Sequence, residues 1–116
     1  METQEILKYI LPEEILEYFE LVNIERSNDQ LQFFLDEKNE KPPDLSSMSL
    51  ESKGFTPAFN LYDFPIRNHK VILKVRRRKW KDTATGKTYT RQWDLKHEGT
   101  SYTKEFALFL KKMSGH

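Results

Sequence analysis

The chain has 116 residues, of which 37% are hydrophobic and 13% aromatic, so it is long enough for one domain with a modest core. This composition argues against disorder along the whole chain, no apolar run is long enough to cross a bilayer, and the acidic N-terminus does not resemble a signal peptide. The chain has no cysteine, which excludes disulfides and thiolate metal sites and favours a cytoplasmic protein.

The formal net charge of +1 hides a division between the two halves of the chain. Residues 1 to 63 carry 14 acidic and 5 basic side chains, a net of −9, whereas residues 64 to 116 carry 4 acidic and 14 basic ones, a net of +10. This segregation favours a polyanionic partner for the second half. The alternative is that the two halves fold against each other and neutralise their charges internally.

The first half predicts helical segments followed by a β-hairpin. Residues 5 to 9 predict a short helix or a frayed lead-in. Residues 12 to 19 predict a short helix that packs on the core, because Pro12 suits the first helical position and acids follow it. Residues 21 to 26 and 30 to 37 alternate in polarity around a Ser-Asn-Asp turn, which is typical of a hairpin.

Residues 39 to 57 are polar and rich in proline and serine, which predicts a long loop. The alternating pattern of residues 59 to 66 then predicts a strand that Pro65 ends or places at a sheet edge. Residues 67 to 70 predict the turn into the next strand.

The strongest feature of the chain is the strand predicted for residues 71 to 81. It starts as an apolar, β-branched run and then becomes cationic. Since successive side chains of a strand point to opposite faces, one face is predicted to carry Lys74, Arg76, Arg78 and Trp80. Five cations fall within six positions, namely Arg76, Arg77, Arg78, Lys79 and Lys81.

Residues 82 to 87 have turn chemistry, because Asp82 can cap its own backbone and Gly86 can adopt a positive φ. Residues 87 to 95 predict the returning strand of a basic hairpin, in which Trp80 lies near Tyr89 and Arg78 lies near Arg91. Residues 103 to 113 predict a C-terminal helix with a threonine cap and two lysines in its last turn.

Catalytic chemistry is weakly supported. The three histidines have no metal-ligand spacing to one another or to paired carboxylates, the serines have no nearby base, and the four glycines form no phosphate-binding loop. We therefore expect no enzyme activity, no catalytic residues, no metal and no cofactor.

The basic hairpin favours nucleic-acid binding, because cations that neutralise phosphates release counterions and a two-stranded ribbon fits the major groove. A solvated edge strand would not need five cations in six positions. Lys74, Arg76, Arg78 and Arg91 are expected to face a duplex, and Arg77, Lys79 and Lys81 to contact phosphates. Trp80, Tyr89 and Trp93 are expected to be the hairpin aromatics, with both tryptophans in cation–π contact with arginines.

The chain resembles the N-terminal region of insertion-sequence transposases, including short separate polypeptides of that kind. The resemblance is carried by residues 63 to 66 (DFPI), 70 to 80 (KVILKVRRRKW), 86 to 87, 91 to 95 (RQWDL), 99 to 100 and 103 to 106 (TKEF). With residues 11 to 19 and 37 to 39, it covers nearly the whole chain. It implies binding to the terminal repeats of the element, without catalysis in this segment, and residues 103 to 113 would lead into a helix-turn-helix and a nuclease domain.

The chain is also similar to the zinc-ribbon-like head of larger transposases, from which it departs in one respect. The cysteine pairs of that head would fall within residues 42 to 54 and just beyond Trp80, where this sequence has none. The resemblance therefore implies a degenerate, metal-free version of the zinc ribbon.

The sequence predicts a single α+β domain over residues 1 to 116, rich in β-hairpins, with two hairpins, one further strand and a helix at each end. Its segments are an acidic helix plus hairpin (1–38), a loop (39–57), a basic β region (58–96) and a C-terminal helix (103–113). The expected function is non-catalytic DNA binding to element ends, with a separate catalytic transposase subunit as a further partner and no membrane association. The alternative is a protein-interaction module whose basic hairpin binds an acidic protein or a second copy of the chain, forming a homo-oligomer.

Overall fold

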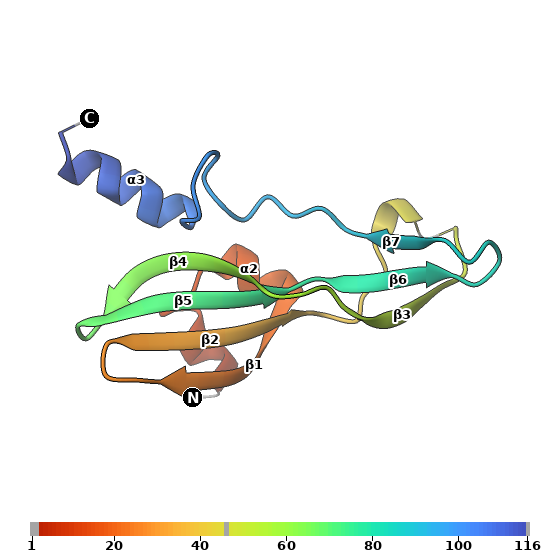
Figure 1. The fold of residues 1–116 in the computed structure, drawn as a ribbon, viewed down its shortest axis with the longest axis horizontal. Helices are drawn as coiled ribbons and strands as arrows, with labels where there is room; N and C mark the ends of the chain where they lie inside the picture. Colours follow the sequence, from red (N-terminus) through yellow and green to blue (C-terminus); the bar gives the residue numbers. More distant parts are fainter. Residues whose placement is uncertain (1–2, 46, 116) are drawn as a thin grey trace.

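A computed structural model of the protein describes residues 3–45 and 47–115 (Figure 1). They form a mixed α+β fold, mostly β-sheet with short helices at both ends, as the sequence predicts. The helices are α1 (Thr3–Leu7), α2 (Glu13–Tyr18), the 3-10 helix η1 (Pro43–Leu45) and α3 (Lys104–Met113). The strands are β1 (Phe19–Arg26), β2 (Gln30–Glu37), β3 (Leu50–Phe55), β4 (Phe59–Ile66), β5 (His69–Arg76), β6 (Arg78–Asp82) and β7 (Thr88–Thr90).

The strands form two sheets that share one long stretch of chain. The first sheet has four strands in the order β1-β2-β5-β4, and the second has three in the order β3-β6-β7. β5 and β6 are the inner strands of their sheets and follow each other with only Arg77 between them, so the chain passes directly from one sheet into the next (Figure 1). The strand predicted for residues 71 to 81 is therefore confirmed, apart from this break at Arg77.

The main core lies on one face of the four-stranded sheet. The alternating residues Leu73 and Val75 of β5 and Leu35 of β2 are fully buried there, together with Ile15 of α2 and Leu7 of α1. The two N-terminal helices lie behind this sheet in the view of Figure 1. Each fully buried aliphatic side chain contributes about 1.5–3 kcal/mol, and the helix predicted for residues 12 to 19 packs on the core as expected, through Ile15.

The three-stranded sheet has a smaller buried region of its own. Trp80 of β6 is 2% exposed and Leu50 of β3 is 5% exposed, yet neither belongs to the main core cluster. Trp80 is paired with Tyr89 of β7, as the sequence predicts for the hairpin. The turn after Trp80 also follows its predicted chemistry, because Asp82 Oδ1 accepts a hydrogen bond from the Ala84 backbone N–H at 3.0 Å and Gly86 has a φ of 77°.

The predicted loop over residues 39 to 57 is wrong in part, because it contains η1 and the whole of β3. The sequence of β3 is LESKGF, which has few strand-forming residues. The strand forms because β6 offers it a free edge, so that Leu50 pairs with Asp82 and Ser52 with Trp80. Tertiary pairing has overridden weak local propensity.

The returning strand predicted for residues 87 to 95 is too long, since β7 covers only Thr88–Thr90. After Thr90 the chain leaves the small sheet and runs beside the large one, where Leu95 is buried in the main core and Trp93 packs against it. The expected count of two hairpins and one further strand is also too low, because it gives five strands where the described residues form seven. β3 and the break of the predicted strand into β5 and β6 account for the difference. The predicted turn before β5 joins it to β4, with φ values of 51° at Arg67 and 66° at Asn68.

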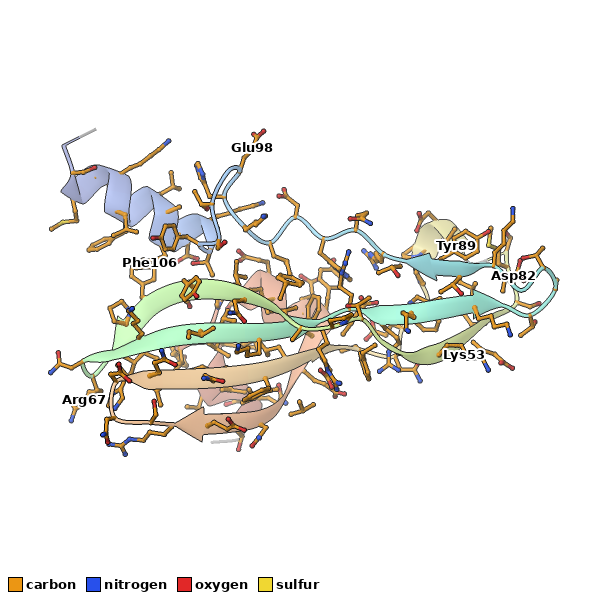
Figure 2. All side chains as sticks on the ribbon, in the orientation of Figure 1. Lys53, Arg67, Asp82, Tyr89, Glu98 and Phe106 are labelled. Carbon is orange, nitrogen blue, oxygen red and sulfur yellow. The ribbon has the colours of Figure 1, made fainter. Side chains whose placement is uncertain are left out.

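The C-terminal helix is confirmed, with Thr103 as its N-cap. It lies on the outer strand of the large sheet, where Phe106 and Phe109 pack on Phe64 of β4 with ring centroids 5.1 and 5.3 Å apart. Figure 2 shows Phe106 in this position, beneath the helix and facing β4. In the described part of the chain, every helix is too short or too polar to cross a membrane.

Asp63 of β4 is a buried carboxylate that connects this strand to α3. The Thr103 hydroxyl donates a hydrogen bond to Asp63 Oδ1 at 2.8 Å. Burial raises the pKa of Asp63 above its ordinary value of 3.8, the hydrogen bonds from Thr103 and from the Phe64 backbone offset this only in part, and nearby Glu14 raises it further. Since ionisation is penalised in the folded state, the free energy of unfolding falls as the pH rises from 3.8 through the raised pKa.

The variant Asp63→Asn keeps an acceptor for Thr103 and removes the buried charge. We expect it to be more stable than the native chain at neutral pH, with a stability difference that shrinks as the pH falls toward the ordinary pKa of a carboxyl group. Urea unfolding of both proteins at pH 7 and at pH 4.5 measures this difference. A stability difference between the two proteins that grows at the lower pH would contradict the raised pKa of Asp63.

Candidate nucleic-acid interface

Arg76 is held by an internal carboxylate at the end of β5. Its Nε donates to Asp36 Oδ1 at 2.7 Å and its Nη2 donates to Asp36 Oδ2 at 2.6 Å, which is the bidentate geometry of a strong pair. The hydrogen bonds to Asp36 raise the pKa of Arg76 further. Asp36 is buried on β2, so this pair joins the two inner strands of the large sheet.

Arg78 is the corresponding connector at the start of β6. Its Nη1 donates to the Ser52 Oγ of β3 at 2.6 Å, and its Nη2 donates to the backbone oxygen of Glu37 at 3.1 Å. The guanidinium groups of Arg76 and Arg78 lie 4.4 and 4.7 Å from the centroid of the Phe55 ring. Two of the four cations that were expected to face a duplex thus have partners within the chain.

The carboxylate of Glu37 is the other buried acid at the end of β2, with 2% of the residue exposed. It accepts a hydrogen bond from Trp93 Nε1 at 2.8 Å and one from the backbone N–H of Arg78 at 3.3 Å. We call the set Asp36, Glu37, Arg76, Arg78 and Phe55 the junction, because it fixes the place where the chain crosses from one sheet to the other.

The aromatic residues of the predicted site have different environments. The guanidinium of Arg91 lies 4.2 Å from the centroid of Trp93 and 5.2 Å from that of Tyr18, which confirms the expected cation–π contact at Trp93. The prediction of a second cation–π contact at Trp80 is wrong. Among the described residues, the arginines stack on Phe55, Tyr18 and Trp93. Trp80 is a core residue because the face that it shares with Arg78 is covered.

Arg91 lies beyond the end of β7, so it is not paired with Arg78 as the predicted register required. Tyr89 is half-buried beside Trp80. Figure 2 shows Tyr89 and Lys53 at the end of the molecule that carries the small sheet, and Arg67 at the opposite end.

In the described part of the chain, four of the predicted cations have no ion pair, no side-chain hydrogen bond and no cation–π contact: Lys74, Arg77, Lys79 and Lys81. Lys79 and Lys81 lie opposite Thr90 and Thr88 on the face of the small sheet that Trp80 does not occupy. The described ion pairs are Arg76–Asp36, Lys104–Asp94 and Lys53–Glu51. Only the first joins the two halves of the chain, so internal neutralisation accounts for little of the charge division.

A groove of about 820 Å³ gathers several of the unpaired cations. Lys74 of β5, Arg77 at the strand break and Lys96 beyond β7 line it, together with the rings of Phe59, Tyr62 and Trp93. Its other described lining residues are Ala58, Asn60, Leu95 and Ser101, so none of them is acidic. We call this feature the cationic groove.

Lys96 and Tyr62 were not among the predicted site residues. Both lie in the cationic groove because residues 93 to 101 run beside β4, with backbone hydrogen bonds from Tyr62 N–H to the Ser101 oxygen and from Thr103 N–H to the Tyr62 oxygen. The excess of basic residues in the second half was the only sequence signal for Lys96. No group of three or more histidine and acidic side chains within the described residues is placed to hold a metal ion.

Comparisons with protein-family models, with curated proteins and with solved structures found no match for this chain.

The junction predicts different roles for two neighbouring cations. Arg76→Ala leaves the buried Asp36 carboxylate without two charge-assisted donors, but the Arg76 side chain is 44% exposed and water screens the pair, so we expect a loss of about 1–2 kcal/mol in the free energy of unfolding. Lys79→Ala removes the same unit of charge from a side chain without a carboxylate partner, so we expect a change within about 0.5 kcal/mol. Urea unfolding of both variants measures this contrast, and equal losses would argue against the junction.

Proposed function

We propose that this chain is the non-catalytic DNA-binding N-terminal region of a transposase, and that it binds the ends of the element through the basic strand β5–β6. The observation that carries the proposal is a cluster of cations around the basic strand that have no carboxylate partner in the described part of the chain. Five such cations are Lys74, Arg77 and Lys96 in the cationic groove and Lys79 and Lys81 on the small sheet.

Desolvated or clustered cations without counter-charges repel one another, and a polyanion relieves that repulsion while releasing its own counterions. Lys79 and Lys81 project from an inner strand whose backbone is paired on both sides, so their positions are fixed by the sheet. Arg76 and Arg78 act indirectly, since the junction holds β6 in place. Arg91 supports Trp93 and Tyr18 through cation–π contacts.

The transposase part of the proposal rests on the resemblance of residues 63 to 106 to transposase N-terminal regions. Under that resemblance the small sheet corresponds to a metal-free relative of a zinc-ribbon-like head, and a separate catalytic subunit is a further partner. These finer points remain predictions. The mixed α+β fold with a basic inner strand is compatible with them.

A second candidate function is a protein-interaction module, and one feature favours it. A pocket of about 630 Å³ near the N-terminal helices is lined by the carboxylates of Glu13, Glu14 and Glu105 and by the single lysine Lys8, so the molecule also has an acidic surface. Under this alternative the basic strand of one copy binds the acidic pocket of another, or the acidic surface of a different protein. Salt-sensitive oligomers in sedimentation without nucleic acid would support it.

Fluorescence anisotropy with a labelled random duplex at several salt concentrations tests the proposed function. We expect log affinity to fall linearly with log salt. The double variant Lys79→Ala/Lys81→Ala should reduce that slope by about 1.8, because each duplex phosphate contact contributes about 0.9.

The matched control is Lys111→Ala/Lys112→Ala, which removes two exposed charges from α3 and should leave the slope unchanged. If both double variants reduce the salt slope equally, the affinity depends on net charge alone and not on contacts made by Lys79 and Lys81. A native chain that does not bind the duplex at low salt, or that prefers an acidic peptide, would refute the proposed function.

A further inference from the structure

One residue of the cationic groove, Arg77, has a buried hydrogen-bond donor without an acceptor in the described part of the chain. Arg77 Nε is buried and has no hydrogen-bond partner among the described residues. A buried charged donor without an acceptor is costly, and such groups in folded proteins are few. The backbone of Arg77 is satisfied, since its N–H donates to Thr56 Oγ1 at 3.2 Å and its oxygen accepts from the Thr56 N–H at 2.8 Å. Within Arg77, the Nε is therefore the buried atom that lacks an acceptor; Trp80 Nε1, in the core of the small sheet, is the other such donor among the described residues.

The missing acceptor is expected to be an anion that comes from outside the chain. The other basic lining residues are Lys74 and Lys96, which are donors, and the described lining has no carboxylate. Asn60 and Ser101 add neutral polar groups to the same walls. An oxyanion such as a phosphate group would satisfy Arg77 and screen the repulsion between the three cations at once.

We propose that the cationic groove binds a single-stranded segment of nucleic acid, with its phosphates on Lys74, Arg77 and Lys96. This inference rests on the proposed function and specifies which form of nucleic acid the groove accepts. The volume of about 820 Å³ is typical of pockets that hold one small molecule, about 300–1,000 Å³, so one or two nucleotides fit and a double helix does not.

The walls of the groove also suit the bases of such a segment. Aromatic rings bind unpaired bases by stacking without regard to sequence. Trp93 already contacts the Arg91 guanidinium at 4.2 Å and Phe59 packs against the main core, which leaves Tyr62 as the ring for stacking. Duplex contacts then belong to Lys79 and Lys81, which lie outside the groove lining on the small sheet. The chain would thus bind DNA at a boundary between a double-stranded and a single-stranded segment.

The test compares three labelled probes by anisotropy: a blunt duplex, the same duplex with a short single-stranded overhang, and a single strand of equal length. We expect the native chain to bind the overhang duplex more tightly than the blunt one. Lys74→Ala/Lys96→Ala should remove that preference and lower the salt slope for the single strand by about 1.4, since each single-strand phosphate contact contributes about 0.7. Binding of the blunt duplex should change little.

Lys79→Ala/Lys81→Ala should give the converse result, with weaker binding of the blunt duplex and a retained preference for the overhang. Lys111→Ala/Lys112→Ala again controls for net charge. If the native chain binds no DNA, the proposed function fails. If it binds the blunt and overhang duplexes equally, or if Lys74→Ala/Lys96→Ala weakens all three probes alike, only the single-strand assignment fails.

Arg77→Met separates binding from folding in the same experiment. It keeps the aliphatic stem of the side chain and removes the unsatisfied donor, so we expect urea unfolding to show equal or greater stability. Binding of the single strand should nevertheless weaken. A variant that is clearly destabilised would mean that the guanidinium has a structural partner, which overturns the proposed anion site at Arg77.

Discussion

The bidentate pair between Arg76 and Asp36 is the interaction on which the rest of the structure depends. One stretch of chain serves as the inner strand of two sheets, and nothing in backbone pairing alone fixes how the second sheet follows the first. The Arg76–Asp36 pair and the hydrogen bonds from Arg78 to Glu37 and Ser52 fix that crossing from both sides. The acceptor residues Asp36 and Glu37 are buried, whereas the Arg76 side chain is 44% exposed, so water competes for the Arg76–Asp36 pair from the arginine side.

The junction also changes how the charge division of the chain is interpreted. The basic run looked uniform in sequence, yet its members have two kinds of partner. Arg76 and Arg78 are bound to β2 and β3, whereas Arg77, Lys79 and Lys81 have no carboxylate partner in the described residues. A single ion pair between the halves leaves most of the positive charge of the second half available to a ligand, and the sheet framework holds those side chains in fixed positions before the ligand arrives.

The sequence predicted those elements whose signals are local. Pro12 with its following acids, the Thr103 cap and the alternation around Leu73 each determine a helix or a strand from nearby residues. It failed where pairing between distant segments decides the outcome. β3 forms from a poor strand sequence because β6 needs a partner, and Lys96 reaches the cationic groove because the backbone near Ser101 pairs with β4. The roles of Arg76 and Arg78 depend on residues about 26 to 41 positions away, which no local pattern reveals.

Arg77 illustrates why identical side chains in one strand acquire different functions. It occupies the only position between β5 and β6, where the regular ladder is interrupted and the alternation of faces is no longer imposed by sheet pairing. Its neighbours on either side are bound to the carboxylate of Asp36 and to the backbone oxygen of Glu37 at the end of β2. Between them, Arg77 Nε is buried without an acceptor in the described part of the chain, and the residue lines a groove whose described residues include no acid. Under the proposal, a strand break between two bound arginines creates an anion site without any dedicated loop.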